Sequence, residues 1–146
     1  MNSIISISKK VKEYFSFLEN EFGFIKTSEY QYVTEIHNEF VKNGLIIQIV
    51  YDGDIWMNIL KPKFNIQILL NEEKRITDYD ITNFKYYDVK NLDLDNSIWK
   101  SINSDKLSDK RLRYYSKLLQ SNKEILNGNL KKLKWYFPII RKLGFN

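Results

Sequence analysis

The chain has 146 residues, the size of one ordinary domain, and its 43% hydrophobic and 28% charged residues exclude an intrinsically disordered protein. It contains no cysteine, which excludes disulfide bonds and thiolate metal ligands. The net charge is +5, but the residues from 100 onward carry +9 and those before them carry −4. This asymmetry concerns the choice of a partner rather than the fold.

The N-terminal sequence "MNSIISISKKVKEYF" places its lysines after a short apolar patch, whereas a secretory signal places its basic residues before the apolar region. No apolar run approaches the roughly 18 residues of a membrane span. We therefore expect a soluble, cytoplasmic protein without a membrane partner.

Helical periodicity comes first in the chain. Val11, Phe15, Leu18 and Phe22 recur at steps of four, three and four residues, which is the apolar stripe of an amphipathic helix. Gly23 follows at the position where a left-handed residue commonly ends a helix. The pattern predicts a helix over residues 6–22.

The next segments have the two-residue period of strands. Residues 29–37, "EYQYVTEIH", alternate in a way that predicts one half-buried strand. Asn43-Gly44 predicts a turn, and "LIIQIVYDGDIWMNILK" predicts a hairpin that turns at Asp52-Gly53. The segment "FNIQILL" after this hairpin predicts a fourth strand.

A two-residue loop at Asp52-Gly53 would fix which residues share a face of this hairpin. Such a loop places Tyr51, Trp56 and Asn58 on one face. Both faces are mostly apolar, so each of them needs a cover. We expect the helices to cover one face, and either the rest of the chain or a partner to cover the other.

The last third of the chain returns to a helical period. Residues 71–103 are polar, with short elements expected around 81–87 and 98–102. A helix then starts near Ser104 or Ser108 and closes at Asn127-Gly128, and its apolar stripe is Leu112, Tyr115, Leu119, Ile125 and Leu126. We expect a second helix over Leu130–Leu143, with a kink or break near Phe137 because Pro138 cannot donate a backbone hydrogen bond.

These elements together predict one α+β domain over residues 1–146. Its parts are an N-terminal helix, an antiparallel sheet of about four strands with a central hairpin, and a C-terminal helix pair that packs on the sheet.

No combination of residues in the sequence indicates a catalytic mechanism. His37 is the sole histidine and is interpreted as a surface or turn residue, since no nucleophile motif accompanies it. The segment "LDLDNS" begins like a calcium-binding loop, but Ile98 and Ser104 stand where that loop needs Gly and Glu. We therefore expect a protein that is not an enzyme and that uses no metal or other cofactor.

The basic segment "LKKLKWYFPIIRKL" allows two interpretations. In the simpler one, the lysine stems shield a half-packed Trp135 on the body of the protein. In the other, an aromatic and basic platform binds an acidic protein or a nucleic acid. The nucleic-acid interpretation uses Lys131, Lys132, Lys134, Trp135 and Arg141.

Three segments carry a resemblance to known proteins: "FLENEFGF", "IIQIVYDGDIWMNI" and "KLLQSNKEILNGNLKKL". They resemble a loose group of small, largely uncharacterised bacterial proteins with an "FL…E.GF" opening, a "YD" hairpin and an "iL.G" helix pair. Members of such groups are suspected immunity proteins of polymorphic-toxin systems. The resemblance implies a scaffold and a possible toxin partner, and it assigns no site residues.

The favoured hypothesis is a protein that binds another protein, as an immunity protein binds its cognate toxin. The expected contacts are Tyr51, Trp56 and Asn58, because aromatic anchors dominate interface energies. A homodimer through the same hairpin face would satisfy the apolar pattern equally well. The alternative hypothesis is a nucleic-acid-associated protein that uses the basic C-terminal residues.

Overall fold

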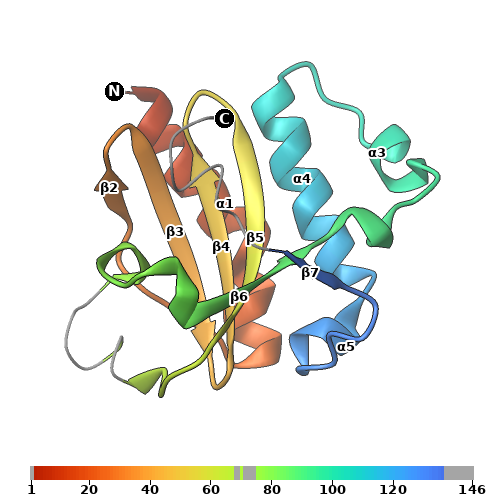
Figure 1. Ribbon diagram of the computed structural model, residues 1–146. Coiled ribbons are helices and arrows are strands. Elements are labelled where there is room, and N and C mark those ends of the chain that lie inside the picture. Colours follow the sequence, from red (N-terminus) through yellow and green to blue (C-terminus); the bar gives the residue numbers. More distant parts are fainter. Residues whose placement is uncertain (1, 68–69, 71–74, 137–146) are drawn as a thin grey trace.

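The computed structural model describes residues 2–67, 70 and 75–136, and it shows an α+β protein with an N-terminal helix and an antiparallel sheet (Figure 1). The helices are α1 (Asn2–Phe22), α3 (Ser97–Ser101), α4 (Leu107–Gln120) and α5 (Lys123–Leu126). The strands are β1 (Ile25–Lys26), β2 (Tyr30–Tyr32), β3 (Glu35–Lys42), β4 (Leu45–Tyr51), β5 (Ile55–Pro62), β6 (Phe84–Asp88) and β7 (Lys134–Tyr136). Three short 3-10 helices lie between them, namely η1 (Ile76–Asp78), η2 (Ile81–Asn83) and η3 (Lys90–Leu92).

The sheet of the described residues has seven strands in the order β1-β3-β4-β5-β6-β7, and β2 also pairs with β3. All of its pairings are antiparallel. The prediction of about four strands was therefore too low. The short strands β1, β2, β6 and β7 lack the long alternating patterns on which the sequence prediction depended.

Helix α1 confirms the prediction from its apolar stripe, although it begins earlier than expected. Val11, Phe15 and Leu18 are fully buried. The helix stops where Gly23 adopts a φ of 75°, and the Phe24 backbone N–H then donates to the Leu18 carbonyl, as in a helix C-cap. Glycine suits this left-handed position because it has no Cβ to clash with the backbone.

Two apolar clusters lie on opposite faces of the sheet, and both are formed by the chain itself. The first joins the sheet to α1, α4 and α5 and contains Phe15, Ile47, Ile59 and Leu119. The second includes Ile46 and Leu60 of the sheet, and Ile66 and Ile76 pack against them. Figure 1 shows α1 behind the sheet and the green segment that contains η1 and η2 in front of it. Each face of the β4–β5 hairpin therefore has an internal cover.

Three of the predicted elements differ in the structure. The strand predicted over residues 29–37 is a hairpin, because a turn at Val33-Thr34 separates β2 from β3. The described part of "FNIQILL" forms no strand, and its Ile66 packs on the second apolar cluster. Residues 130–136 form a turn and β7 rather than a helix, and the kink predicted near Phe137 lies outside the described residues.

The predicted helix from Ser104 or Ser108 to Asn127 is confirmed in part. It is divided into α4 and α5 by a break at Ser121-Asn122, and Leu112, Leu119, Ile125 and Leu126 are all fully buried. Among the described residues, no helix combines the length and the apolar character that crossing a membrane requires.

The carboxylate of Asp109 holds α4 against α1. It accepts hydrogen bonds from the hydroxyls of Tyr14 and Ser104 at 3.0 and 2.8 Å, and it lies 3.3 Å from the Lys10 ammonium and 3.0 Å from Arg113 Nε. Burial by itself would raise the pKa of Asp109, but the hydrogen bonds from Ser104, Tyr14 and Lys10 outweigh it and lower that pKa below its ordinary value.

Replacing Asp109 by Asn should destabilise the protein by about 1–3 kcal/mol at neutral pH, because charge-assisted hydrogen bonds are lost. Because the pKa of Asp109 is lower in the folded than in the unfolded state, its carboxylate stabilises the fold at pH values above the unfolded-state pKa. That stabilisation disappears as pH falls through the folded-state pKa. Urea unfolding should therefore show a gap between wild type and D109N at pH 7 that shrinks at pH 3. The exposed Asp105, replaced by Asn, is the matched control and should change stability little at either pH.

Candidate functional site

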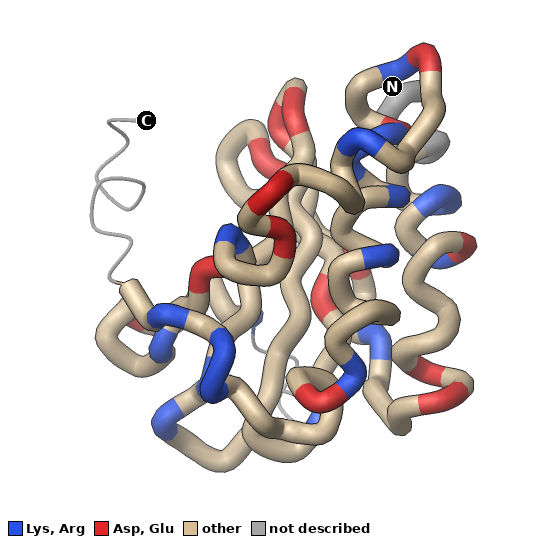
Figure 2. Tube along the Cα trace, turned by 90° about the vertical axis from the view of Figure 1, so that its right-hand side faces the viewer, with Lys and Arg blue, Asp and Glu red and all other residues tan. Residues whose placement is uncertain are grey.

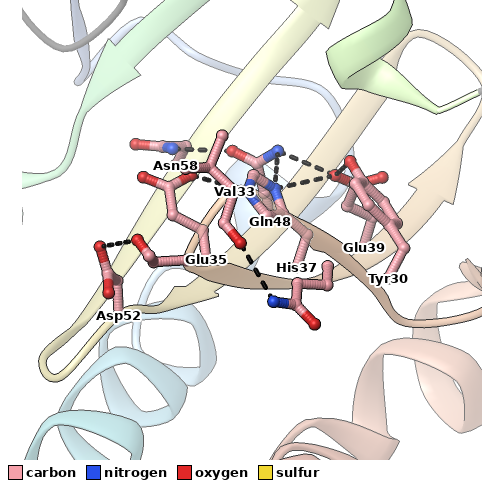
Figure 3. Close-up of polar contacts among 10 residues, drawn as sticks. Tyr30, Val33, Glu35, His37, Glu39, Gln48, Asp52 and Asn58 are labelled. Carbon is pink, nitrogen blue, oxygen red and sulfur yellow. Dashed lines mark hydrogen bonds and ion pairs between the residues drawn. The ribbon is translucent and has the colours of Figure 1, made fainter. Parts of the chain in front are cut away.

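A row of polar side chains crosses the middle of the sheet on the face opposite α1. The strand register places Glu39 of β3 opposite Gln48 of β4, and Gln48 opposite Asn58 of β5. All three are buried. Asn58 Nδ2 donates to Gln48 Oε1, and Gln48 Nε2 donates to Glu39 Oε2, both at 2.8 Å (Figure 3). The row thus links three neighbouring strands through their side chains.

Glu39 is the acidic end of this row. Besides the amide of Gln48, its Oε2 accepts a hydrogen bond from the Tyr30 hydroxyl at 2.5 Å. Burial of that hydroxyl, and then the negative charge of Glu39, raise the pKa of Tyr30 above its ordinary value. Tyr30 therefore stays protonated and keeps donating to the buried carboxylate.

His37 is buried beside the row. Its ring stacks on Tyr30 with a centroid distance of 5.0 Å, and it meets the Tyr32 ring edge-on with the two centroids 6.1 Å apart. Gln48 Nε2 lies 3.2 Å from His37 Nδ1, and the other ring nitrogen, His37 Nε2, lies 2.8 Å from Glu35 Oε1. Because the amide donates to Nδ1, the ring proton belongs on Nε2, from which it is donated to Glu35.

A cavity of about 110 Å³ opens next to these groups. Its sheet side is lined by Glu35, His37, Gln48 and Asn58, and residues 76–81 line the other side. We call this cavity the polar pocket. It combines a carboxylate, an imidazole and two amides in a space that is about the size of one side chain.

The β2–β3 turn, at Val33-Thr34, stands beside the polar pocket. Val33 has a φ of 57°, a left-handed conformation that is unfavourable for a β-branched residue. The turn is held by Gln31 Nε2, which donates to the Val33 carbonyl, and by the Thr34 hydroxyl, which donates to Asp52. The side chain of Val33 is 77% exposed and that of Tyr32 is 40% exposed. A strained turn therefore presents two apolar side chains to solvent.

The three hairpin residues predicted to contact a partner do not share a face. Tyr51 pairs with Ile55, so the loop contains three residues, Asp52 to Asp54, rather than two. The extra residue puts Tyr51 on the face of α1, while Trp56 and Asn58 lie on the face of the polar pocket. Asn58 is buried in the polar row, and Trp56 is half-buried.

The described residues predicted for nucleic-acid binding lie on β7, the last strand in the sheet order, and in the turn that precedes it. Lys131, Lys132 and Lys134 are exposed, and Trp135 on β7 is 60% exposed rather than half-packed. Arg141 lies outside the described residues.

The sequence interpretation of His37 as a surface or turn residue was wrong, because the histidine is buried in β3. The signal that could have revealed it is the spacing of Glu35, His37 and Glu39, which puts three polar side chains on one face of one strand. Polar residues at this spacing in a strand predict either a surface in contact with water or a buried polar cluster. Gln48 and Asn58 on the next strands favour the cluster.

No known protein family, curated protein sequence or solved structure matches the chain. Within residues 2–67, 70 and 75–136, no group of three or more His, Asp or Glu side chains is arranged to hold a metal ion.

Replacing Tyr30 by Phe removes one donor from the buried Glu39 and should lower the free energy of unfolding by about 1.5–3 kcal/mol at pH 7. The raised pKa of Tyr30 makes this stabilisation complete below the pKa of about 10 of an unfolded tyrosine, and it is lost as pH rises further. Guanidinium unfolding at pH 7 and pH 10.5 should therefore show a smaller gap at the higher pH. Tyr32→Phe is the control, and a loss equal to that of Y30F would contradict the specific role of the Tyr30–Glu39 bond.

Replacing Val33 by Asn should stabilise the protein by about 1 kcal/mol, because Asn tolerates the left-handed conformation better than a β-branched residue does. Thermal unfolding measures the change. Leu94→Asn removes another exposed apolar side chain, one that is 80% exposed and has no positive φ, and it should leave stability nearly unchanged. A V33N variant that is no more stable than L94N would show that the turn is not strained.

Proposed function

We propose that the protein acts by binding another protein, without catalysing a reaction, and that this partner docks on the β2–β3 turn and the polar pocket. The observation that carries the proposal is the exposure of Tyr32 and Val33 at a strained turn next to a cavity. Backbone strain of this kind is often kept at binding sites, where it holds a side chain in the position that binding requires.

The size of the polar pocket favours a macromolecular partner. Small-molecule sites commonly enclose about 300–1,000 Å³, whereas this cavity measures about 110 Å³. A single side chain of a partner fits such a space, and interface energies are concentrated in side chains that are buried in pockets of this type. Tyr32 and Val33 would form apolar contacts around that anchor.

The charge at this end of the sheet favours a basic partner. Glu35 at the start of β3 and Asp52 of the β4–β5 loop lie at the same end of the sheet, since Ile36 pairs with Tyr51, and residues before position 100 carry a net charge of −4. Complementary charge speeds association and disfavours acidic competitors. An immunity protein that neutralises a basic toxin is the form of this function that agrees with the resemblance described above.

The β4–β5 hairpin needs neither a partner nor a second copy of the chain to cover its apolar faces. Ile46, Ile47, Ile59 and Leu60 are fully buried within one chain, on both faces of that hairpin. Of the three contacts first expected, Trp56 remains a candidate because it is half-buried and lies on the face of the pocket. The docking surface we propose is therefore the β2–β3 turn with Trp56 beyond it.

The test immobilises three proteins and uses each to capture binding partners from an extract of cells of the encoding organism. The three are wild type, the Tyr32→Ala/Val33→Asn double variant, and the Leu94→Asn control. Mass spectrometry should identify a partner that wild type and L94N retain and the double variant loses. Titration with the purified partner should then show a loss of affinity of about 30-fold or more, the size expected for a binding hot spot. Because V33N alone is predicted to stabilise the fold, such a loss would not reflect unfolding.

The immunity form of the proposal has its own test. Expression of the captured partner in a bacterial host should arrest growth, and co-expression of wild type, but not of the double variant, should restore it. A partner that is harmless would contradict the immunity form and leave protein binding standing. A partner that binds the double variant as tightly as wild type would contradict the proposed docking surface.

A further inference from the structure

The indole of Trp135 is a large apolar surface that the described residues leave open. Trp135 is 60% exposed on β7, the last strand in the sheet order, whereas Trp56 and Trp99 are both half-buried. Lys85 of the neighbouring strand places its ammonium 5.5 Å from the centroid of the indole ring. The strand β7 pairs with β6 at the edge opposite β1, so this surface is separate from the β2–β3 turn.

Exposed lysines lie next to this indole along the chain and on both faces of β7, because Lys85 shares the face of Trp135 and Lys134 points to the other face. Lys131 and Lys132 lie in the turn that leads into β7, and Lys134 precedes the tryptophan. Figure 2 shows blue Lys and Arg segments close together where the chain leads toward its C-terminal end. Two acids reduce the local charge, because Glu124 lies 3.1 Å from Lys132 and Asp88 of β6 is the register neighbour of Lys134. With Lys85, the surface still carries four lysines against two acids.

We infer that this surface binds single-stranded nucleic acid, with one base stacked on Trp135 and the backbone phosphates next to Lys85, Lys131 and Lys134. Every base has an aromatic face that can stack on an indole, and stacking of this kind tolerates any sequence. A base inside a duplex already stacks on its neighbours, so the indole selects an unpaired strand. An acidic protein would use the lysines but would have no need of the open indole.

The energetic signature of such binding is its dependence on salt. Each phosphate that a lysine neutralises releases counterions, and the slope of log K against log salt is about −0.7 per contact for a single strand. Three or four contacts predict a slope of about −2 to −3. The binding should therefore be measurable at low salt and should weaken strongly near physiological ionic strength.

The test is fluorescence anisotropy of a labelled 12-nucleotide oligothymidine with the whole protein at 20 mM salt, alongside a 12-base-pair duplex. Wild type should bind the single strand more tightly than the duplex. Trp135→Ala should weaken binding by about 5- to 100-fold, the range expected for loss of one stacked base. The exposed position of Trp135 makes this variant compatible with folding, which circular dichroism checks.

A pair of charge variants separates local from overall electrostatics. The triple replacement of Lys85, Lys131 and Lys134 by Gln should make the slope of log K against log salt less steep, by the amount that about two to three phosphate contacts contribute. The triple replacement of the exposed Lys9, Lys12 and Lys106 by Gln lowers net charge equally and should leave the slope nearly unchanged.

Three results would overturn the inference. They are no binding of the oligothymidine at 20 mM salt, equal binding by wild type and W135A, or equal loss in both triple variants. Displacement of the strand by poly-L-glutamate with no effect of W135A would assign the surface to an acidic protein instead. None of these results bears on the β2–β3 turn, whose test uses different residues and a different readout.

Discussion

A buried carboxylate in the centre of a sheet needs hydrogen-bond donors from several directions, and this requirement shapes the fold around Glu39. Tyr30 supplies one donor from β2, and Gln48 supplies another from β4. A shift of one residue in the pairing of β3 would carry Glu39 to the face of α1, where Phe15 and Ile47 offer no donor. The cost of burying an unsatisfied charge therefore favours this one register over its neighbours.

The same polar row explains why the two faces of the sheet differ. The face against α1, α4 and α5 is filled mainly with apolar side chains, with Asn38 a buried polar exception, whereas the other face divides into an apolar part around Ile46 and Leu60 and a polar part around His37. Residues 76–81 contribute to both parts, since Ile76 packs on the apolar cluster and also lines the polar pocket. The pocket thus exists because one segment has to cover two surfaces of unlike chemistry.

Local patterns predicted the local elements, and the errors arose where distant parts of the chain decide the structure. The stripe from Val11 to Phe22 and the turns at Gly44 and Gly53 were sufficient to place α1 and the central hairpins. The hairpin faces were assigned wrongly because the number of loop residues decides which side chains of the two strands share a face. Sequence alone did not show that Asp54 belongs to the loop. A helix was expected after Leu130, but residues of this segment form β7, because their backbone groups pair with the edge of β6. The paired residues are 46 or more positions apart in sequence.

The candidate site was harder to predict than the fold, for a physical reason. Asn58 was singled out, but it bonds to Gln48 and only through it is linked to Glu39 and Tyr30, and these three residues come from three other strands. No sequence spacing joins these residues, and the strand register alone brings them together. The turn at Val33 also escaped notice, because a valine with a positive φ goes against the preferences from which turns are recognised.

The pairing of β7 with β6 has a consequence for how the molecule is made. Strands β1 to β5 lie within the first 62 residues, and β6 ends at Asp88, but β7 begins only at Lys134. During synthesis on the ribosome, the outer edge of β6 therefore emerges long before the strand that covers it. Until then that edge offers unpaired backbone groups to other nascent chains, so slow translation between these two points lengthens the period in which the protein is most prone to aggregate.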